Sequence, residues 1–487
     1  MCESILLIQP FRKPSIREII VKNYPCWEII NSNSLVMASV LEKAGMKVDF
    51  LNMQNLFKSY ESVQEDSLKG LLSEYEPDIV IFHTDYYISF TSTAVFYSIK
   101  MITSYYKAKS HNTKIILVGR NGLALGKKVF DIDPNIDVVI KGECEDFIVS
   151  LIDSIKNNCL KNISAIIYKE NGKIVENPGI GRILDFDKLP VPAFHLLKNV
   201  LELAERFTGL KMRFVPVSIR TSFGCPMNCR YCGGVSTWNE YHMKSKKSLE
   251  NEIRYFKEVF GNKGKIMFFA DELFAYNMDH VNDVADIFMK NSIKIDGLFA
   301  HSHIFNEELA RKVQKISDFV VFGAENCCDE VLANANKKQT YESLLKAIDI
   351  AKKNNLKVSL EWVVGLPGEN IKTAAKNINA VYQMIATGQV DNINSYVFCP
   401  YPNTEFAVNK EKFGLVIYDS FDEMVEEGYP TYSLTNLTSN QIFIYYLLTQ
   451  VMIKEALLDR EQFQGHFIPQ ECNLERFEEL LEKVGGK

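Results

Sequence analysis

The sequence predicts an α/β protein in which two α/β regions follow one another and a small, mostly helical region closes the chain. Short apolar runs alternate with amphipathic stretches over most of its length, which is typical of parallel sheets covered by helices. The alternation is interrupted once, by a segment with a hairpin pattern and a proline-marked linker. A chain of 487 residues is also too long for one hydrophobic core, so two or three domains are expected.

Residues 1–156 predict a Rossmann-like domain. Apolar strands are expected at SILLIQP, KVDFLNM, PDIVIFH, KIILVG and IDVVIKG. After the first of these, SLVMASVLEKAG carries Leu35, Ala38 and Leu41 on one helical face and Gly45 after its end. Ligands of such parallel sheets bind at the carboxyl ends of the strands. Those ends contain Gln9, Thr84, Asp85, Tyr86, Gly119, Arg120, Asn121, Gly142 and Glu143.

A connecting segment is expected at residues 157–209. ISAIIYKENGKIVENPG alternates apolar and polar residues and predicts a β-hairpin that turns at Asn171 and Gly172. FDKLPVPAF follows, and its prolines prevent a helix from continuing. The segment therefore separates the two α/β regions.

Residues 210–409 predict a partial (β/α)6 barrel of the TIM type. Strands are expected at PVSIRTS, KIMFFADE, DGLFAHSH, FVVFGAEN, KVSLEWVVGLPGE and NINSYVFCPYP, with helices between them, one of them at Glu307–Ile316. Chemistry in parallel barrels lies on the loops after the strands. Here these loops carry the cysteines of TSFGCPMNCRYCGG, then Asp271, Glu272, Glu325, and Gly365 to Glu369.

Residues 410–487 predict a mostly helical region, and the composition as a whole predicts a cytoplasmic protein. SNQIFIYYLLTQVMIKEALL and LERFEELLEKV have helical patterns, but the apolar run Ile442–Ile453 is too short to cross a bilayer. No signal-peptide pattern opens the sequence. The net charge of -6 and the lack of a long basic run give no basis for binding nucleic acid or an anionic membrane.

Three of the 11 cysteines, Cys225, Cys229 and Cys232, have the spacing C-x3-C-x2-C. In a reducing compartment, cysteines are more often buried thiols or metal ligands than disulfides. A cubane iron–sulfur cluster has four irons to ligate, so three thiolates leave one iron open. Two other interpretations stay open at this point: a zinc site that lacks a fourth ligand, and three thiols buried without a metal.

The motif GCPMNCRYCGG after a predicted barrel strand resembles the signature of the radical S-adenosylmethionine (SAM) superfamily. The resemblance implies a 4Fe-4S cluster held by Cys225, Cys229 and Cys232, with SAM chelating the open iron and being cleaved to a 5′-deoxyadenosyl radical. Asp271-Glu272 departs from the family's usual Gly-Glu-Glu. The residues that the resemblance assigns to SAM binding are Tyr231, Gly233, Asp271, Glu272, Glu325, Gly365 and Glu369.

Over most of the chain, the order of motifs is similar to that of radical SAM enzymes with an N-terminal cobalamin-binding domain. These motifs are ILLIQP, EKAG, PDIV, ILVG, VVIKGE, NGKIV, DFDKLPVPAF, FGAEN and VVGLPGE. The resemblance implies cobalamin at the carboxyl edge of the first sheet, near Thr84, Tyr86, Gly119, Arg120, Gly142 and Glu143. No Asp-x-His-x-x-Gly motif occurs in the sequence, so we expect no histidine on cobalt and Tyr86 beneath it. The alternative is a Rossmann-like scaffold without a corrin.

Three further residues are candidates for catalysis. His301 and His303 end a predicted strand on the same face, and histidine titrates near neutral pH. Cys328 lies at a predicted helix start, where a thiolate is favoured. Packing is the alternative in each case: the histidines would fill the barrel mouth, and Cys328 with Cys327 would act as a small apolar residue.

Three functions remain as hypotheses. The first is methylation of an unactivated carbon of a small metabolite or natural-product intermediate, by means of a 5′-deoxyadenosyl radical and methylcobalamin. The second keeps both cofactors but closes or rearranges a ring, and the third is a non-enzymatic metal or corrin carrier. The expected partners are a small-molecule or peptide substrate and an electron donor such as flavodoxin or ferredoxin. We expect no nucleic acid, no membrane, and a monomer or weak dimer.

Overall fold

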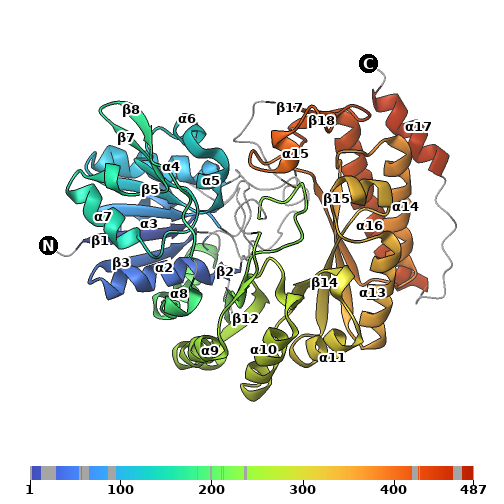
Figure 1. Ribbon diagram of the computed structural model, residues 1–487, viewed down its shortest axis with the longest axis horizontal. Coiled ribbons are helices and arrows are strands. Elements are labelled where there is room, and N and C mark those ends of the chain that lie inside the picture. Colours follow the sequence, from blue (N-terminus) through green and yellow to red (C-terminus); the bar gives the residue numbers. More distant parts are fainter. Residues whose placement is uncertain are drawn as a thin grey trace. The chain divides into compact units, whose positions relative to one another are not determined.

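A computed structural model gives the structure of the chain, which forms two compact units. Unit 1 contains residues 1–221 and 242–270, and unit 2 contains residues 222–241 and 271–487. Figure 1 shows the elements of each unit. The residues that the structure describes are 3–11, 29–53, 56, 65–85, 95–183, 185–197, 200–209, 211, 213–234, 239–418, 426, 428–463 and 474–485.

The main sheet of unit 1 has seven strands in the order β3-β1-β4-β5-β6-β7-β8. The first five of these are parallel, as the Rossmann-like prediction requires, and β7 and β8 are antiparallel. The hairpin of β7 and β8 turns at Asn171 and Gly172, both with positive φ, which confirms the predicted turn. The strands are β1 (Ser4–Gln9), β3 (Lys47–Asn52), β4 (Ile79–His83), β5 (Lys114–Val118), β6 (Val138–Ile140), β7 (Ile166–Glu170) and β8 (Lys173–Glu176).

Amphipathic helices connect these strands. The predicted helix after β1 is present as α2, where the Asn31 side chain accepts a hydrogen bond from the backbone of Asn33 at the start and Gly45 follows the end with φ of 85°. Apolar residues of α2 and of the strands are buried together in the core. The α-helices of unit 1 are α2 (Ser32–Lys43), α3 (Glu65–Leu72), α4 (Phe96–Lys109), α5 (Arg120–Leu125), α6 (Val129–Ile132), α7 (Ile148–Lys156), α8 (Val200–Thr208) and α9 (Lys246–Phe260).

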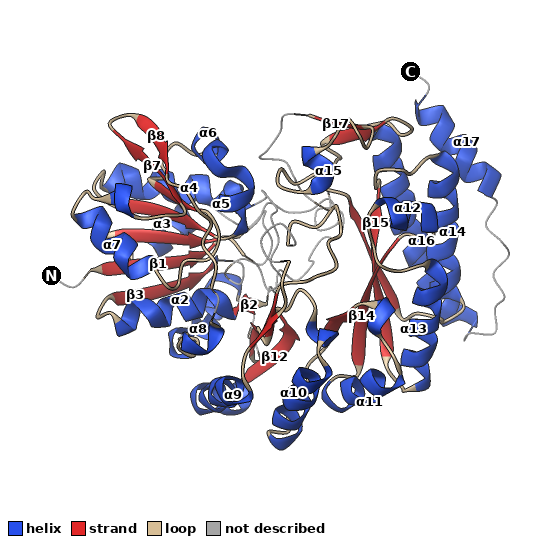
Figure 2. Ribbon diagram, viewed as in Figure 1, coloured by secondary structure: helices blue, strands red, loops and turns tan. Residues whose placement is uncertain are grey.

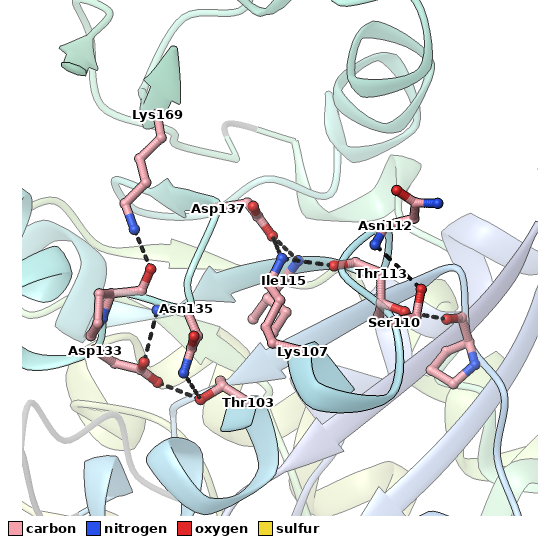
Figure 3. A network of polar contacts seen from close by, with 12 residues as sticks. Thr103, Lys107, Ser110, Asn112, Thr113, Ile115, Asp133, Asn135, Asp137 and Lys169 are labelled. Carbon is pink, nitrogen blue, oxygen red and sulfur yellow. Dashed lines mark hydrogen bonds and ion pairs between the residues drawn. The ribbon is translucent and has the colours of Figure 1, made fainter. Parts of the chain in front are cut away.

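Hydrogen bonds and an ion pair stabilise the amino-terminal edge of this sheet (Figure 3). The carboxylate of Asp137 accepts hydrogen bonds from the backbone N–H of Ile115 and from Nζ of Lys107, each at 2.8 Å. The carboxylate of Asp133 accepts one from the hydroxyl of Thr103 at 2.7 Å. These carboxylates are paired within the fold, so they serve the structure of the loop before β6.

Unit 1 also holds a second sheet, of three strands in the order β12-β9-β2, made of β2 (Ile30–Asn31), β9 (Val215–Ile219) and β12 (Gly264–Phe269). β9 and β12 are the first two strands that we predicted for the barrel. They group with the N-terminal region because β2 pairs with β9. The two compact units group the strands differently from the predicted domains, and the domain boundaries at residues 156, 209 and 409 stay predictions.

The four remaining predicted barrel strands form a parallel sheet in unit 2, in the order β13-β14-β15-β16. Among the described residues, no ladder joins β12 to β13, so the mixed α/β fold is confirmed while the closed partial barrel stays a prediction. The strands are β13 (Leu298–Ala300), β14 (Phe319–Glu325), β15 (Lys357–Val364) and β16 (Asn392–Val397).

Helices cover one face of this sheet (Figure 2). On β15 and β16, buried residues alternate with half-buried ones, which is the pattern of strands with one covered face. The helices of unit 2 are α10 (Met278–Lys290), α11 (Glu307–Ile316), α12 (Asp329–Asn334), α13 (Tyr341–Lys353), α14 (Ile371–Ala386), α15 (Glu405–Val408), α16 (Ser439–Phe463) and α17 (Leu474–Gly485). Short strands β10 (Ser222–Phe223), β17 (Leu415–Ile417) and β18 (Tyr432–Leu434) also belong to this unit, and β11 (His242–Met243) belongs to unit 1.

Helix α16 is longer than the apolar run suggested. Its segment Ser439–Glu461 is, by length and composition, the one helix of the described chain that is apolar enough to cross a membrane. The helix packs on the sheet and its helices, however: the side chain of Gln450 donates to the carbonyl oxygen of Ser395, and Tyr382 of α14 donates to Asp459. These contacts join α16 to the sheet and to α14 within unit 2.

Candidate active site

The three cysteines of the predicted cluster lie in one loop of unit 2, after β10. The backbone N–H of Cys232 donates to the carbonyl oxygen of Cys229 at 3.2 Å, and the three thiols interact electrostatically. Burial raises the pKa of Cys225 to about 12 and that of Cys229 to about 11. Both thiols are therefore protonated at neutral pH unless a cation stabilises the thiolates, and bound iron would do so. Gly233, which is buried, follows directly.

The spacing of the ligands favours a cluster over a single metal ion. Within the described residues, no three His, Cys, Asp or Glu side chains gather closely enough to hold one ion. A zinc site would need such a group. A four-iron cluster instead takes one thiolate on each of three irons, so its cysteines surround it at larger separations.

Two acidic residues that we assigned to SAM contact the cysteine loop itself. The hydroxyl of Ser222 donates to Oδ2 of Asp271 at 2.9 Å, and the backbone N–H of Gly224 donates to Oε2 of Glu272 at 3.0 Å. Asp271 is only 2% exposed, so we infer that it holds the loop in place. Glu272 is half-buried, and its role as a SAM ligand stays a prediction.

Glu325 forms the centre of a buried polar group at the end of β14. Its Oε1 accepts a hydrogen bond from the hydroxyl of Tyr231 at 3.0 Å and forms an ion pair with Nζ of Lys337 at 2.7 Å. The side chains of Glu325 and Lys337 are each 8% exposed. Burial alone would lower the pKa of Lys337, but the charges of Glu325 and Cys229 raise it above its usual value. The structure thus brings Tyr231 and Glu325 together as predicted and adds Lys337, which interacts with the cysteine loop.

The backbone conformation at Glu325 orients its side chain toward Lys337. Glu325 has φ of 65°, a left-handed conformation that is strained for a side chain other than glycine, and the register of β14 with β15 shifts here. A Cβ atom on Gly323 would lie 2.5 Å from Oε1 of Glu325 and 2.7 Å from Nζ of Lys337. The ion pair therefore lies over Gly323, on the face of the sheet to which that residue points.

Glu369 stabilises the loop after β15. Its Oε2 accepts hydrogen bonds from the backbone N–H groups of Gly365 at 2.6 Å and Leu366 at 3.0 Å, and its Oε1 accepts from the side chains of Asn326 and Asn377. Burial raises the pKa of Glu369 to about 8. Both oxygens accept hydrogen bonds from the chain itself, which is the arrangement of a positioning residue, and the cofactor contact of Glu369 stays a prediction.

Gly365 requires its glycine for two reasons. Its φ is 82°, and a Cβ atom there would lie 2.2 Å from the hydroxyl oxygen of Tyr432. That hydroxyl donates to the carbonyl oxygen of Gly365 at 2.7 Å. The tight contact fixes the loop for any ligand that approaches its backbone.

The two histidines differ in environment, against our prediction. β13 ends at Ala300 and His301 is still extended, but His303 lies in a 3-10 turn, Ser302–Ile304, so the alternation of a strand does not extend from His301 to His303. His303 is exposed and donates its backbone N–H to Nδ1 of His301 at 3.2 Å. A neutral His301 ring then carries its proton on Nε2, and this buried atom has no partner among the described residues. Burial lowers the pKa of His301 to about 3, so it is a neutral donor and not a proton-transfer group at neutral pH.

Cys328 lies at the start of α12 as predicted, but the cause of its properties is different. Its Sγ lies 3.9 Å from Sγ of Cys327. The hydrogen bond from Cys327 lowers the pKa of Cys328, whereas the pKa of Cys327 is raised. A neighbouring thiol, not the helix end, is thus what favours the Cys328 thiolate.

The predicted cofactor residues of unit 1 gather at the carboxyl edge of its sheet. The backbone N–H of Arg120 donates to Oδ1 of Asp85 at 2.9 Å, and the hydroxyl of Thr84 donates to the carbonyl oxygen of Val118. Gly119 and Gly142 form a β-bridge. A Cβ atom on Gly119 would lie 2.5 Å from Oγ1 of Thr84, so glycine is needed for this close packing.

Two carboxyl groups follow β6 at the same edge. Oε2 of Glu143 accepts a hydrogen bond from the backbone N–H of Ile183 at 3.0 Å, and burial raises the pKa of Glu143 to about 8 and that of Glu145 to about 7. Tyr86, which we expected beneath cobalt, lies outside the described residues. His83 at the end of β4 is buried, with 3% of its surface exposed.

Sequence reasoning missed several residues of the site. Lys337 lies in the polar loop NANKKQT, and no pattern there indicates a buried lysine. Glu361 in KVSLEWVV is a charge inside an apolar strand, and that anomaly could have drawn attention to it.

Residues 219–381 match the model of the Radical SAM superfamily. The chain thus has a radical SAM domain and is a radical SAM enzyme, which confirms the resemblance drawn from the cysteine motif. The domain implies a 4Fe-4S cluster and SAM, as predicted.

Two curated proteins and a solved structure are similar over much of the chain. An uncharacterised methyltransferase of Pyrococcus horikoshii is 24% identical over 412 residues, 81% of this chain and 84% of that protein. An anaerobic magnesium-protoporphyrin IX monomethyl ester cyclase of Rubrivivax gelatinosus is 24% identical over 363 residues, 70% of this chain and 60% of that protein.

The solved structure is that of the radical SAM methyltransferase TsrM from Kitasatospora setae, with cobalamin and a 4Fe-4S cluster bound. It has a TM-score of 0.64 and 13% identity, and the alignment covers 100% of this chain and 99% of TsrM. At this identity the likeness establishes a shared fold over the whole chain.

Proposed function

We propose that this protein is a cobalamin-dependent radical SAM enzyme that methylates an unactivated carbon of a small metabolite or natural-product intermediate. The observation that carries the proposal is the full-length likeness in fold to TsrM, a methyltransferase whose structure contains cobalamin and a 4Fe-4S cluster. The methyltransferase relative from Pyrococcus horikoshii supports the same reaction type.

The residues of unit 2 fit a cluster and SAM. Cys225, Cys229 and Cys232 would hold the cluster, since burial raises the pKa of the Cys225 and Cys229 thiols and bound iron would stabilise their thiolates. Tyr231, Glu325 and Lys337, which interact with Cys229, would contact SAM. When bound, the cluster and SAM supply hydrogen-atom abstraction and cobalamin supplies the methyl group. The chain itself orients these groups through anchors such as Glu369 and Asp271, which fix the loops.

The carboxyl edge of unit 1 would hold cobalamin. Parallel α/β sheets bind ligands at this edge, and here Thr84, Gly119, Arg120, Gly142 and Glu143 lie together. His83 is the histidine that the structure describes at this edge, and only 3% of its surface is exposed. This supports the expectation that no histidine coordinates cobalt, with Tyr86 proposed as the cover.

Anaerobic reconstitution tests the proposal. Protein loaded with iron, sulfide and hydroxocobalamin is reduced in the presence of SAM and assayed by mass spectrometry. We expect about four irons and four sulfides per chain, one bound cobalamin, and release of 5′-deoxyadenosine. A protein that binds the cluster and releases 5′-deoxyadenosine but takes up no cobalamin would contradict the proposal.

A second candidate is ring closure or rearrangement with the same cofactors. The similarity to the Rubrivivax gelatinosus cyclase favours it. The mass of the product separates the two reactions, because methylation adds one CH2 unit and a rearrangement leaves the mass unchanged. A non-enzymatic carrier, the third hypothesis, would release no 5′-deoxyadenosine.

We also propose the setting in which the enzyme works. A cytoplasmic protein, a monomer or weak dimer, would receive electrons from a flavodoxin or ferredoxin. The net charge of -6 offers no general attraction to nucleic acid.

A further inference from the structure

The sheet of unit 2 has one face that its helices do not cover, here called the inner face. On β15 and β16, residues of the other face, such as Leu360, Trp362 and Ile393, are buried. The residues of the inner face are partly exposed, apart from the buried Val321 and Ser359, and several are polar. They are Phe299, Val321, Gly323, Ser359, Glu361, Val363, Asn392, Asn394 and Tyr396.

Glu361 lies in the middle of this face. It pairs in register with Gly323 on one side and Asn394 on the other, so all three point to the same face. Since the ion pair of Glu325 and Lys337 lies over Gly323, Glu361 is its neighbour on the next strand. The two strands are about 4.8 Å apart.

The polar side chains around Glu361 direct their hydrogen bonds toward it. Nδ2 of Asn392 donates to Oδ1 of Asn394 at 3.1 Å, and Nδ2 of Asn394 donates to Oε1 of Glu361 at 3.1 Å. The hydroxyl of Tyr396 is a second hydrogen-bond partner of the carboxyl group. The network fixes the orientation of the carboxylate and stabilises its charge.

This carboxylate nevertheless has no counterion within the part of the chain that the structure describes. Burial, together with the weaker effect of the carboxylates of Glu325 and Glu426, raises the pKa of Glu361 to about 7. Lys337, whose Nζ lies over Gly323, is already bonded to Glu325 at 2.7 Å. A half-buried carboxylate that is held in place but lacks a cation is costly unless a ligand supplies the missing charge.

We infer that Glu361 binds a positively charged nitrogen of the substrate, either a primary ammonium or a guanidinium group. The inference rests on the proposed function and adds the chemical class of the substrate to it. A substrate on the inner face would lie beside Glu325, Lys337 and Tyr231, the group that interacts with the cysteine loop. Reaction and recognition would then share one face of the sheet.

His301 supplies a complementary donor on the same face. It follows Ala300, which pairs with Phe322, so in an extended backbone it points the same way as Phe299. Its Nε2 is buried and without a partner among the described residues. A substrate that carries a hydrogen-bond acceptor as well as the cation would satisfy both groups.

A pair of matched probes tests the inference. Phenethylamine and 2-phenylethanol have similar shape but differ in charge at neutral pH. Their binding to the full-length, cluster-reconstituted protein is measured by ligand-observed NMR titration. We expect the amine to bind at least about tenfold more tightly than the alcohol. In Glu361→Gln, which keeps the hydrogen bond from Asn394, the preference should fall to about twofold or less.

The controls separate charge from folding. Glu308→Gln neutralises an exposed carboxylate on α11 and should keep the full preference. Glu361→Ala serves as a second variant if the amide substitution does not fold. An unchanged preference in either Glu361 variant, or no preference in the wild-type protein, overturns the inference.

The outcome is also separable from the proposed function. Cobalamin uptake and 5′-deoxyadenosine release by the wild-type protein test the reaction type without any amine probe. Release together with a lost amine preference overturns only the assignment of Glu361. A retained preference without release overturns only the proposed reaction.

Discussion

Two groups of carboxylates in this protein have opposite surroundings. At the amino-terminal edge of the sheet in unit 1, Asp137 is paired with Lys107 and with the backbone of Ile115 (Figure 3). On the inner face of unit 2, Glu361 accepts hydrogen bonds from neutral groups, and the charges of Glu325 and Glu426 raise its pKa. The charge of Asp137 has a counterion within the fold, whereas that of Glu361 has none among the described residues.

The difference indicates how structural and functional charges can be told apart. A carboxylate that is fully paired contributes to stability, and its loss costs free energy of unfolding. A carboxylate that lacks a counterion reduces stability and is retained for another reason, such as ligand binding. The predictions below test this distinction, in order of expected effect.

The largest effect is expected at the cysteine loop. Substituting Ala for Cys225, Cys229 and Cys232 together should remove the cluster and abolish SAM cleavage, because the cluster would lose all three of its proposed thiolate ligands. Iron content and 5′-deoxyadenosine release measure the effect. Cys159→Ser, in unit 1, should retain both. A full cluster in the triple variant would disprove the ligand assignment.

Breaking the ion pair of Lys337 should cost the most stability. Lys337→Met leaves the buried charge of Glu325 without a partner, which should lower the free energy of unfolding by about 3–5 kcal/mol. The double variant with Glu325→Gln should recover most of this loss, since both charges are then gone. Urea denaturation of the cluster-free protein measures the free energy of unfolding of the wild type, the two single variants and the double variant. Equal losses in the single and double variants would argue against the pair.

Two glycines with similar φ separate backbone strain from crowding. Gly365 has φ of 82° and no room for a Cβ atom, whereas Gly172 has φ of 76° and nothing within 4 Å. Gly365→Ala should therefore cost about 2–4 kcal/mol and Gly172→Ala about 1–2 kcal/mol. Comparable losses in denaturation experiments would show that the Tyr432 contact relaxes.

Two substitutions that each remove one negative charge test the comparison between Asp137 and Glu361. Asp137→Asn removes an ion pair and should cost about 1 kcal/mol. Glu361→Gln removes an uncompensated charge and should leave the free energy of unfolding unchanged or raise it. A clear loss of stability in Glu361→Gln would place Glu361 with the structural carboxylates.

The smallest effect concerns pH. Burial and the charge of Glu145 raise the pKa of Glu143 to about 8, above its ordinary value of 4.5. The folded state then binds this proton more tightly than the unfolded state, so its contribution is complete below pH 4.5 and is lost as pH rises through 8. The Glu143→Gln variant should lack this decline, which we expect to be about 1 kcal/mol because the group is half-buried. Unfolding curves between pH 5 and 8 would measure it, and parallel profiles would contradict the assignment.

Much of the fold follows from local sequence. The strands of both sheets and helix α11 lie where apolar periodicity placed them, because that pattern reflects which side chains are buried. Caps and turns, such as Asn171-Gly172, have equally local causes. The pairing of β2 with β9, which moved two barrel strands into unit 1, could not be predicted because it joins segments almost 190 residues apart.

The candidate site divides in the same way. The sequence by itself indicated the three cysteines, because cluster ligation needs a fixed local spacing, and the family resemblance indicated Tyr231 and Glu325. Only the tertiary structure decided that Lys337 neutralises Glu325 and that Glu361 has no such partner. A side chain's charge is written in the sequence, but its counterion and burial depend on strand order, register and the covered face of the sheet. These are properties of the assembled chain, because burial and pairing set the free energy of a charge.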